Sequence, residues 1–229
     1  METSAVESSR EPNFLLAKWE KRALRAIAAR LPRWILPDDL SAIGILSAAG
    51  ICTAYVLSNG DAAWLWLASA LLVVHWLGDS LDGTLARARG IQRPRYGYYL
   101  DHLVDAVSTV LIGIGLGLSP FMLLSVGAVI VVAYLVLSIN VYLESQALGR
   151  FSIGYGRVGP TEARLGLIAL NTVLILTGGI GFEVLDTNVS ALDLAGIAAA
   201  CVMVALVGAR AVANLRELAA AEPAAARGR

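Results

Sequence analysis

Four aspartates interrupt an otherwise apolar sequence, and their spacing allows them to share one site. Asp79 and Asp82 are three residues apart at the end of one apolar run, and Asp101 and Asp105 are four apart near the start of the next. Residues at these spacings lie on one face of a helix, so each pair presents two carboxylates in one direction. Carboxylates at membrane depth are costly and usually mark a site with a partner. The alternative is two pairs of helix-end carboxylates that face water.

The chemistry of such a site follows from its donors. Oxygen ligands without histidine or cysteine favour Mg²⁺, Mn²⁺ or Ca²⁺ over zinc. Four carboxylates can support two ions about 4 Å apart, which is the arrangement that clamps the attacking and leaving oxygens in phosphoryl transfer. Arg87 follows Asp82 within two turns and offers a planar group that can grip a phosphate with two hydrogen bonds. Gly83 and Ala86 are small, so a ligand or a neighbouring helix could approach closely there.

The composition predicts an integral membrane protein. The chain has 229 residues, of which 57% are hydrophobic and 16% charged, and its mean hydropathy is +0.68. A soluble domain carries about 25% charged residues. We expect an all-α fold, a bundle of six transmembrane helices of roughly 20 residues each. The expected spans are Leu40–Leu57, Ala62–Gly78, Tyr98–Leu118, Phe121–Leu143, Ala163–Ile180 and Ala191–Val212.

The basic residues predict the orientation. All 18 Lys and Arg residues fall before the first span, between spans two and three, around the gap between spans four and five, or from the last turn of the sixth span onward. The opposite gaps, around Asn59, Pro120 and Asp186, hold none. The positive-inside rule therefore places both termini and the aspartates on the cytoplasmic side of a multi-pass cell-membrane protein.

The segment before the first span is helical by pattern but too charged to cross a membrane. Residues 13–31 form an apolar stripe that includes Trp19, Ala23 and Ile27, with basic residues opposite. This pattern is typical of a helix in the membrane interface, although a soluble helix packed on a partner would have it too. We expect a cytoplasmic N-terminus (1–38) with this amphipathic helix, a six-helix catalytic domain (39–216) and a flexible tail (217–229). Tyr55, Trp64 and Trp66 are expected at the outer interface.

Two stretches carry a family resemblance. They are Asp79-Ser-Leu-Asp82-Gly83-Thr-Leu-Ala86-Arg87 and Gly97-Tyr-Tyr-Leu-Asp101-His-Leu-Val-Asp105. Together they resemble the signature of the CDP-alcohol phosphotransferase (CDP-alcohol phosphatidyltransferase) family. Every fixed position of the signature is present. The nine residues between Arg87 and Gly97 are one more than the usual gap, and they fall in the loop between the two expected spans.

The resemblance implies roles for these residues. Asp79, Asp82, Asp101 and Asp105 would hold two Mg²⁺ or Mn²⁺ ions, and Asp79, Gly83, Ala86 and Arg87 would contact the CDP part of the donor. Asp105 would also be the base that takes the proton of the acceptor hydroxyl. Gly97 would let the two helices approach closely. Family members often form dimers, so the resemblance also implies a homodimer as one possible assembly.

Several other residues are candidates for contacts to the acceptor or to its phosphate. They are Arg93, Arg95, Glu162 and Arg164. Ordinary loop charge explains Arg93 and Arg95 equally well, as it does Arg89. Glu162 follows the helix-start signal Gly159-Pro160-Thr161, which is a sufficient structural reason for its place.

We therefore expect a membrane enzyme of phospholipid synthesis that transfers a substituted phosphate to an alcohol and releases CMP. The favoured donor is CDP-diacylglycerol; the alternative is transfer of a small headgroup from a CDP-alcohol to diacylglycerol. The expected partners are the donor, the alcohol and the bilayer, with no nucleic acid. A cation transporter is a distant alternative, since it would place acids near the midplane on several helices.

Overall fold

The structure, a computed structural model, describes residues 17–149, 159–184 and 187–222. Within this part of the chain it contains seven helices and a two-stranded hairpin. The helices are α1 (Ala17–Ala28), α2 (Pro37–Leu57), α3 (Trp64–Arg89), α4 (Pro94–Gly117), α5 (Leu124–Leu148), α6 (Pro160–Thr177) and α7 (Ala191–Ala221). The strands are β1 (Gly181–Val184) and β2 (Thr187–Ser190). The expected all-α architecture is thus present, with one small hairpin added.

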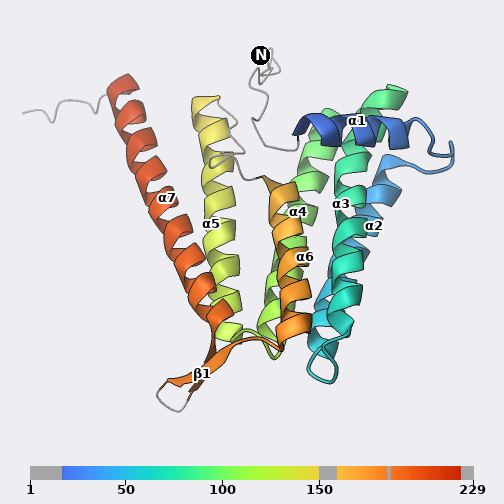
Figure 1. The fold of residues 1–229 in the computed structure, drawn as a ribbon. Helices are drawn as coiled ribbons and strands as arrows, with labels where there is room; N and C mark the ends of the chain where they lie inside the picture. The colour runs from blue at the N-terminus through green and yellow to red at the C-terminus, as the bar shows by residue number, and fades with distance from the viewer. Residues whose placement is uncertain (1–16, 150–158, 185–186, 223–229) are drawn as a thin grey trace, which may run out of the picture.

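The axes of the long helices α2 to α7 are roughly aligned, and α1 lies across one end of them (Figure 1). Helix α2 packs against α3 and α4, α4 packs against α5, α5 against α7, and α6 against α3. The end of α7 lies at the same end of the bundle as α1, and the hairpin lies at the opposite end (Figure 1). This placement agrees with an even number of crossings.

Five of the helices are long and apolar enough to cross a membrane, namely α2, α3, α4, α5 and α7. Helix α6 occupies the place of the remaining expected span and runs alongside the others (Figure 1). It has 18 residues and carries Glu162 and Arg164 in its first two turns, so, unlike the longer helices, it contains no 18-residue segment that leaves these charges out. The count of six spans therefore stays a prediction.

The helices extend beyond the apolar segments on which the predicted spans were based. Helix α3 continues past Gly78 to Arg89 and ends at Gly90, whose φ of 67° is a left-handed conformation that glycine adopts without strain. Helix α4 begins at Pro94, where a proline fits the first helical turn. All four aspartates therefore lie on continuous helix, and Asp101 and Asp105 lie in the third and fourth turns of α4.

A close crossing of α2 and α3 fixes the height of the first aspartate pair. A Cβ built on Gly78 would lie 2.7 Å from the carbonyl oxygen of Leu40 and 2.9 Å from the backbone nitrogen of Gly44. A side chain at this position would push the helices apart, so glycine is required by the contact. Asp79 follows directly and is thereby held beside the first turns of α2.

The hairpin between α6 and α7 was not expected from the sequence. Strands β1 and β2 pair antiparallel, with Phe182 opposite Val189. The second strand leads into a firm helix start: the backbone N–H of Asp193 donates to Ser190 Oγ at 3.0 Å, and Asp193 Oδ2 accepts from the Ser190 N–H at 2.7 Å. Asp193 Oδ1 also accepts from the backbone N–H of Leu123 at 2.7 Å, which ties the start of α7 to the start of α5.

Helix α1 forms within the predicted amphipathic segment, but the face that it buries only overlaps the predicted stripe, with which it shares Ile27. Leu24 and Ala28 are buried against Leu40, Leu81 and Leu85 of α2 and α3. Trp19, assigned to the apolar stripe from the sequence, is 72% exposed. The apolar face of α1 is therefore used first to pack on the bundle, and its residence in a membrane interface stays a prediction.

Candidate active site

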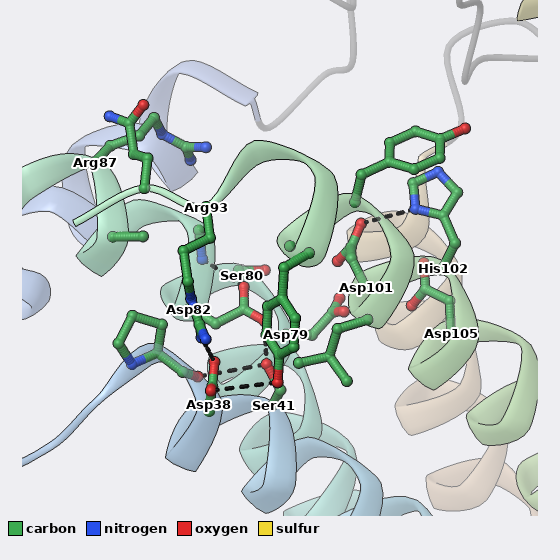
Figure 2. A pocket seen from close by; sticks show the side chains of 18 of the residues that line it. Asp38, Ser41, Asp79, Ser80, Asp82, Arg87, Arg93, Asp101, His102 and Asp105 are labelled. Atoms are coloured by element: carbon green, nitrogen blue, oxygen red, sulfur yellow. Dashed lines mark hydrogen bonds and ion pairs between the residues drawn. The ribbon is translucent and has the colours of Figure 1, made fainter. Parts of the chain in front are cut away.

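Three of the four aspartates converge. One carboxylate oxygen from each of Asp79, Asp101 and Asp105 lies within 4.8 Å of the other two. Asp79 comes from α3 and the other two from α4, and all three side chains are partly buried (Figure 2). The spacing expected from the sequence thus brings side chains of two neighbouring helices to one place.

Asp82 lies to one side of this group. Its Oδ2 accepts a hydrogen bond from Ser41 Oγ at 2.6 Å, and its Oδ1 accepts one from the backbone N–H of Gly83 at 2.5 Å. Asp82 lines the same cavity as the other three aspartates (Figure 2). That Asp82 is a fourth metal ligand is therefore a proposal. To bind an ion, its carboxylate would have to keep Ser41 as a second partner or rotate away from it.

Arg164 forms an ion pair with one member of the carboxylate group. Its Nη2 lies 2.7 Å from Asp79 Oδ2, and the two side chains are 14% and 18% exposed. The pair joins α6 to α3. An arginine inside a carboxylate cluster offsets the mutual repulsion of the acids, and it orients the oxygen that it binds.

The carboxylates border a cavity of about 620 Å³. Gly83, Ala86 and Arg87, the expected donor contacts, line it together with Gly97. A Cβ on Gly83 would lie 3.3 Å from a guanidinium nitrogen of Arg87, so a larger residue there would displace the arginine. Arg87 itself donates to Thr84 Oγ1 at 3.3 Å and is otherwise exposed toward the cavity.

The surroundings of Gly97 differ from the expectation that it lets two helices approach closely. A Cβ at this position would meet no atom within 4 Å among the residues that the structure describes. The close helix approach attributed to Gly97 is therefore wrong for this structure. The close approach beside the site is made by Gly78 instead, and the open space at Gly97 belongs to the cavity wall.

A second ion pair borders the cavity. Arg93 donates to Asp38 and stacks over the ring of Tyr96 at 3.9 Å from the ring centroid (Figure 2). Its hydrogen bond with Asp38 raises the pKa of Arg93. The pair links the start of α2 to the start of α4 and borders the space where a ligand would enter.

The remaining acceptor candidates separate into different surroundings. Arg95 is exposed and does not appear among the residues that line the cavity. Glu162 borders the cavity, and its carboxylate accepts from the backbone N–H of Gly159 at 3.0 Å, as expected for a residue that caps α6. Arg89 points away to the backbone between α1 and α2, where it donates to the carbonyls of Ile35 and Pro32 at 2.5 and 2.8 Å.

Three residues near the site were not assigned this place from the sequence. Ser41 binds Asp82, and Glu20 of α1 lines the cavity. His102 also lines the cavity, and its Nδ1 lies 3.3 Å from Asp101 Oδ2 (Figure 2). The helical pattern gives no signal for Ser41 or Glu20, because each meets its partner across a long sequence separation.

The donor set fits a hard divalent cation. Asp79, Asp101 and Asp105 supply only carboxylate oxygens, which suit Mg²⁺ and Mn²⁺. Three acids brought within 4.8 Å of one another also need positive charge beyond that of Arg164, which pairs with Asp79.

Comparisons with known proteins agree with this site. The sequence model of the CDP-alcohol phosphatidyltransferase family matches residues 34–204, which include both helices that carry the aspartates. Cholinephosphotransferase 1 of Danio rerio is 25% identical over 189 residues, covering 75% of this chain and 47% of the relative. The chain thus spans about half the length of that relative. Because the family match covers most of the chain, the protein belongs to the CDP-alcohol phosphatidyltransferase family of membrane transferases.

Proposed function

We propose that the protein transfers a substituted phosphate from a CDP-linked donor to the hydroxyl of an alcohol at the site formed by α3 and α4. In this reaction the acceptor oxygen forms a bond to the phosphorus that carries the substituent. The bond from that phosphorus to the bridging oxygen of the diphosphate breaks, and CMP leaves. The convergence of Asp79, Asp101 and Asp105 beside a cavity lined by Arg87 supports this proposal most directly.

The residues of the chain have distinct tasks in the proposal. Arg87 holds the diphosphate with its planar guanidinium, and the small Gly83 and Ala86 leave room for the donor. Asp105 takes the proton of the acceptor hydroxyl as the bond forms. Arg164 orients Asp79 and is a candidate contact for the acceptor or for its phosphate.

Asp79, Asp101 and Asp105, with Asp82, would hold Mg²⁺ or Mn²⁺. When bound, these ions would neutralise charge on the diphosphate and stabilise the leaving group. Arg164 binds Asp79 Oδ2, which leaves the other oxygen of Asp79 to hold an ion.

Two classes of donor are compatible with this proposal. The family resemblance favours CDP-diacylglycerol with a polar alcohol as acceptor. The relative from Danio rerio is a cholinephosphotransferase, which instead supports the second direction, in which a headgroup phosphate moves from a CDP-alcohol to diacylglycerol. Both use the same carboxylates, so the choice depends on the residues around the acceptor and on the fit of the donor substituent.

The decisive experiment is a paired assay of the purified full chain in lipid vesicles. One arm contains radiolabelled CDP-diacylglycerol and a panel of polar alcohols; the other contains radiolabelled CDP-choline or CDP-ethanolamine and diacylglycerol. We expect CMP release and a labelled lipid in one arm, loss of both with a chelator, and recovery with Mg²⁺ or Mn²⁺. Failure of both arms at saturating metal would overturn the proposed function.

A further inference from the structure

Glu20 of the surface helix α1 contacts two helices of the active site through a single atom. Its Oε1 accepts a hydrogen bond from Trp76 Nε1 of α3 at 2.9 Å and another from Thr161 Oγ1 of α6 at 2.9 Å. All three side chains are partly buried in these bonds. Hydrogen bonds to a charged acceptor are stronger than bonds between neutral groups.

The two partners of Glu20 stand one helical turn from active-site residues. Trp76 precedes Asp79 by three residues on α3, and Thr161 precedes Arg164 by three residues on α6. Residues three apart share a face of a helix. Glu20 therefore connects the same two helices, on the same faces, that the ion pair of Asp79 and Arg164 connects.

Helix α6 depends on such polar contacts more than its neighbours do. It packs mainly against α3, and only Asn171 and Leu174 of its residues are buried. Farther along α6, Asn171 binds Ser69 at 3.1 Å and Tyr55 at 3.1 Å, which secures its middle. The first turn of a helix lacks intrahelical partners for its N–H groups and tends to fray, so an external anchor there has a large effect.

We propose that Glu20 is a positioning residue of the active site. It holds the first turn of α6 against α3, and it thereby sets where Arg164 meets Asp79. Its effect on catalysis rests on the proposed function, whereas its effect on α6 does not. The surface helix is by this contact a working part of the site, although it lies outside the bundle (Figure 1).

Four single substitutions test the role of Glu20. Glu20→Ala removes the acceptor, whereas Glu20→Gln removes the charge but keeps an oxygen able to accept both bonds. Thr161→Val removes the hydroxyl at nearly constant volume. Arg25→Gln is the matched control, because it changes one charge on an exposed side chain of the same helix.

The first readout is amide hydrogen exchange of the full chain in nanodiscs, followed at residues 164–167 of α6, whose N–H groups bond to the carbonyls of its first turn. We expect exchange to rise at least about fivefold in Glu20→Ala and Thr161→Val, and less than about twofold in Glu20→Gln and Arg25→Gln. Unchanged exchange in Glu20→Ala would overturn the proposal. This result holds whether or not the enzyme assay succeeds, so the two proposals fail separately.

The second readout is steady-state kinetics per mole of folded enzyme. We expect kcat to fall roughly tenfold in Glu20→Ala, with donor KM changed less than about twofold, because a small displacement of a positioning group costs rate. Glu20→Gln should restore most of the rate. The double variant with Thr161→Val should be no slower than the slower single variant. Additive losses, or Glu20→Gln as slow as Glu20→Ala, would show instead that Glu20 touches substrate directly and would refute the positioning role.

Discussion

The carboxylates of the site are not equivalent, and their contacts separate their roles. Asp79 is paired with Arg164, Asp82 is bound by Ser41, and Asp101 lies beside His102. Asp105 belongs to the converging group, beside Asp79 and Asp101. We propose Asp105 as the acid that exchanges a proton with the substrate.

Substitution of Asp105 by asparagine tests that role. Asp105→Asn keeps the shape but removes the base, so CMP release should fall roughly 10²–10⁴-fold. Binding of the CDP donor, followed by calorimetry, should change little, since the donor contacts lie on α3. Asp61→Asn, the same change at the opposite end of the bundle, should leave both measurements unaltered. Normal turnover in Asp105→Asn would remove it as the base.

Arg87 is the one cavity arginine proposed to bind the donor, because Arg93 and Arg164 are each paired with an aspartate. Arg87→Lys keeps the charge but loses the planar pair of donors, so we expect donor KM to rise roughly tenfold with a smaller change in kcat. Arg95→Lys is the matched control, since Arg95 is exposed and lies outside the cavity lining. Equal donor KM in the two variants would argue against a phosphate contact by Arg87.

At the scale of helices, the crossing at Gly78 connects packing to chemistry. The same glycine that lets α2 and α3 touch sets the depth of Asp79, one residue later. Tight backbone contacts of this kind recur in the bundle, for example where a Cβ on Gly115 would lie 2.7 Å from the Cα of Cys52. Such contacts are rigid, so contacts between backbones, and not adaptable side chains, determine the geometry of the site.

Gly78→Ala should therefore separate the helices locally. We expect a lower Tm, corresponding to about 1–3 kcal/mol, and a raised Mg²⁺ requirement for CMP release. Gly166→Ala on α6 is the control, because a Cβ there meets no atom within 4 Å among the described residues. The control should be neutral or slightly stabilising, since alanine favours helix over glycine. A Gly78→Ala variant as stable as Gly166→Ala would contradict the close crossing.

The sequence predicted the parts that follow from local spacing. Helical periodicity and the apolar segments were enough to place the aspartate pairs on two adjacent helices. Contacts between distant segments could not be predicted in this way. Tyr55 was expected at the outer interface, yet it is fully buried and its hydroxyl donates to Asn171 of α6. The hairpin was missed because its strands have only four residues each, too few for a period to be recognised.

The molecule as a whole has two unlike ends. One end carries α1 and the end of α7, and the other carries the hairpin (Figure 1). The aspartates lie in the second half of α3 and the first half of α4, toward the end that carries α1. The distribution of basic residues predicts that the first end faces the cytoplasm. Substrates would then be drawn from the cytoplasm and from the inner leaflet.

Cysteine labelling tests this orientation. In a variant with Cys52 and Cys201 replaced by alanine, Asn188→Cys in the hairpin should react with a membrane-impermeant maleimide in intact cells. Arg95→Cys should react only after the membrane is opened. The reverse pattern would show that the protein has the opposite orientation. Labelling of both sites in intact cells would contradict the prediction that they lie on opposite sides of the membrane.

The contacts of Arg89 have a mechanical consequence. Its guanidinium binds the carbonyls of Leu31, Pro32 and Ile35, so the elbow between α1 and α2 is fastened to the last turn of α3. These hydrogen bonds restrict movement of the segment between α1 and α2 relative to α3. A displacement of α1 would therefore carry the last turn of α3 with it, so the two helices move as one unit at this end of the bundle.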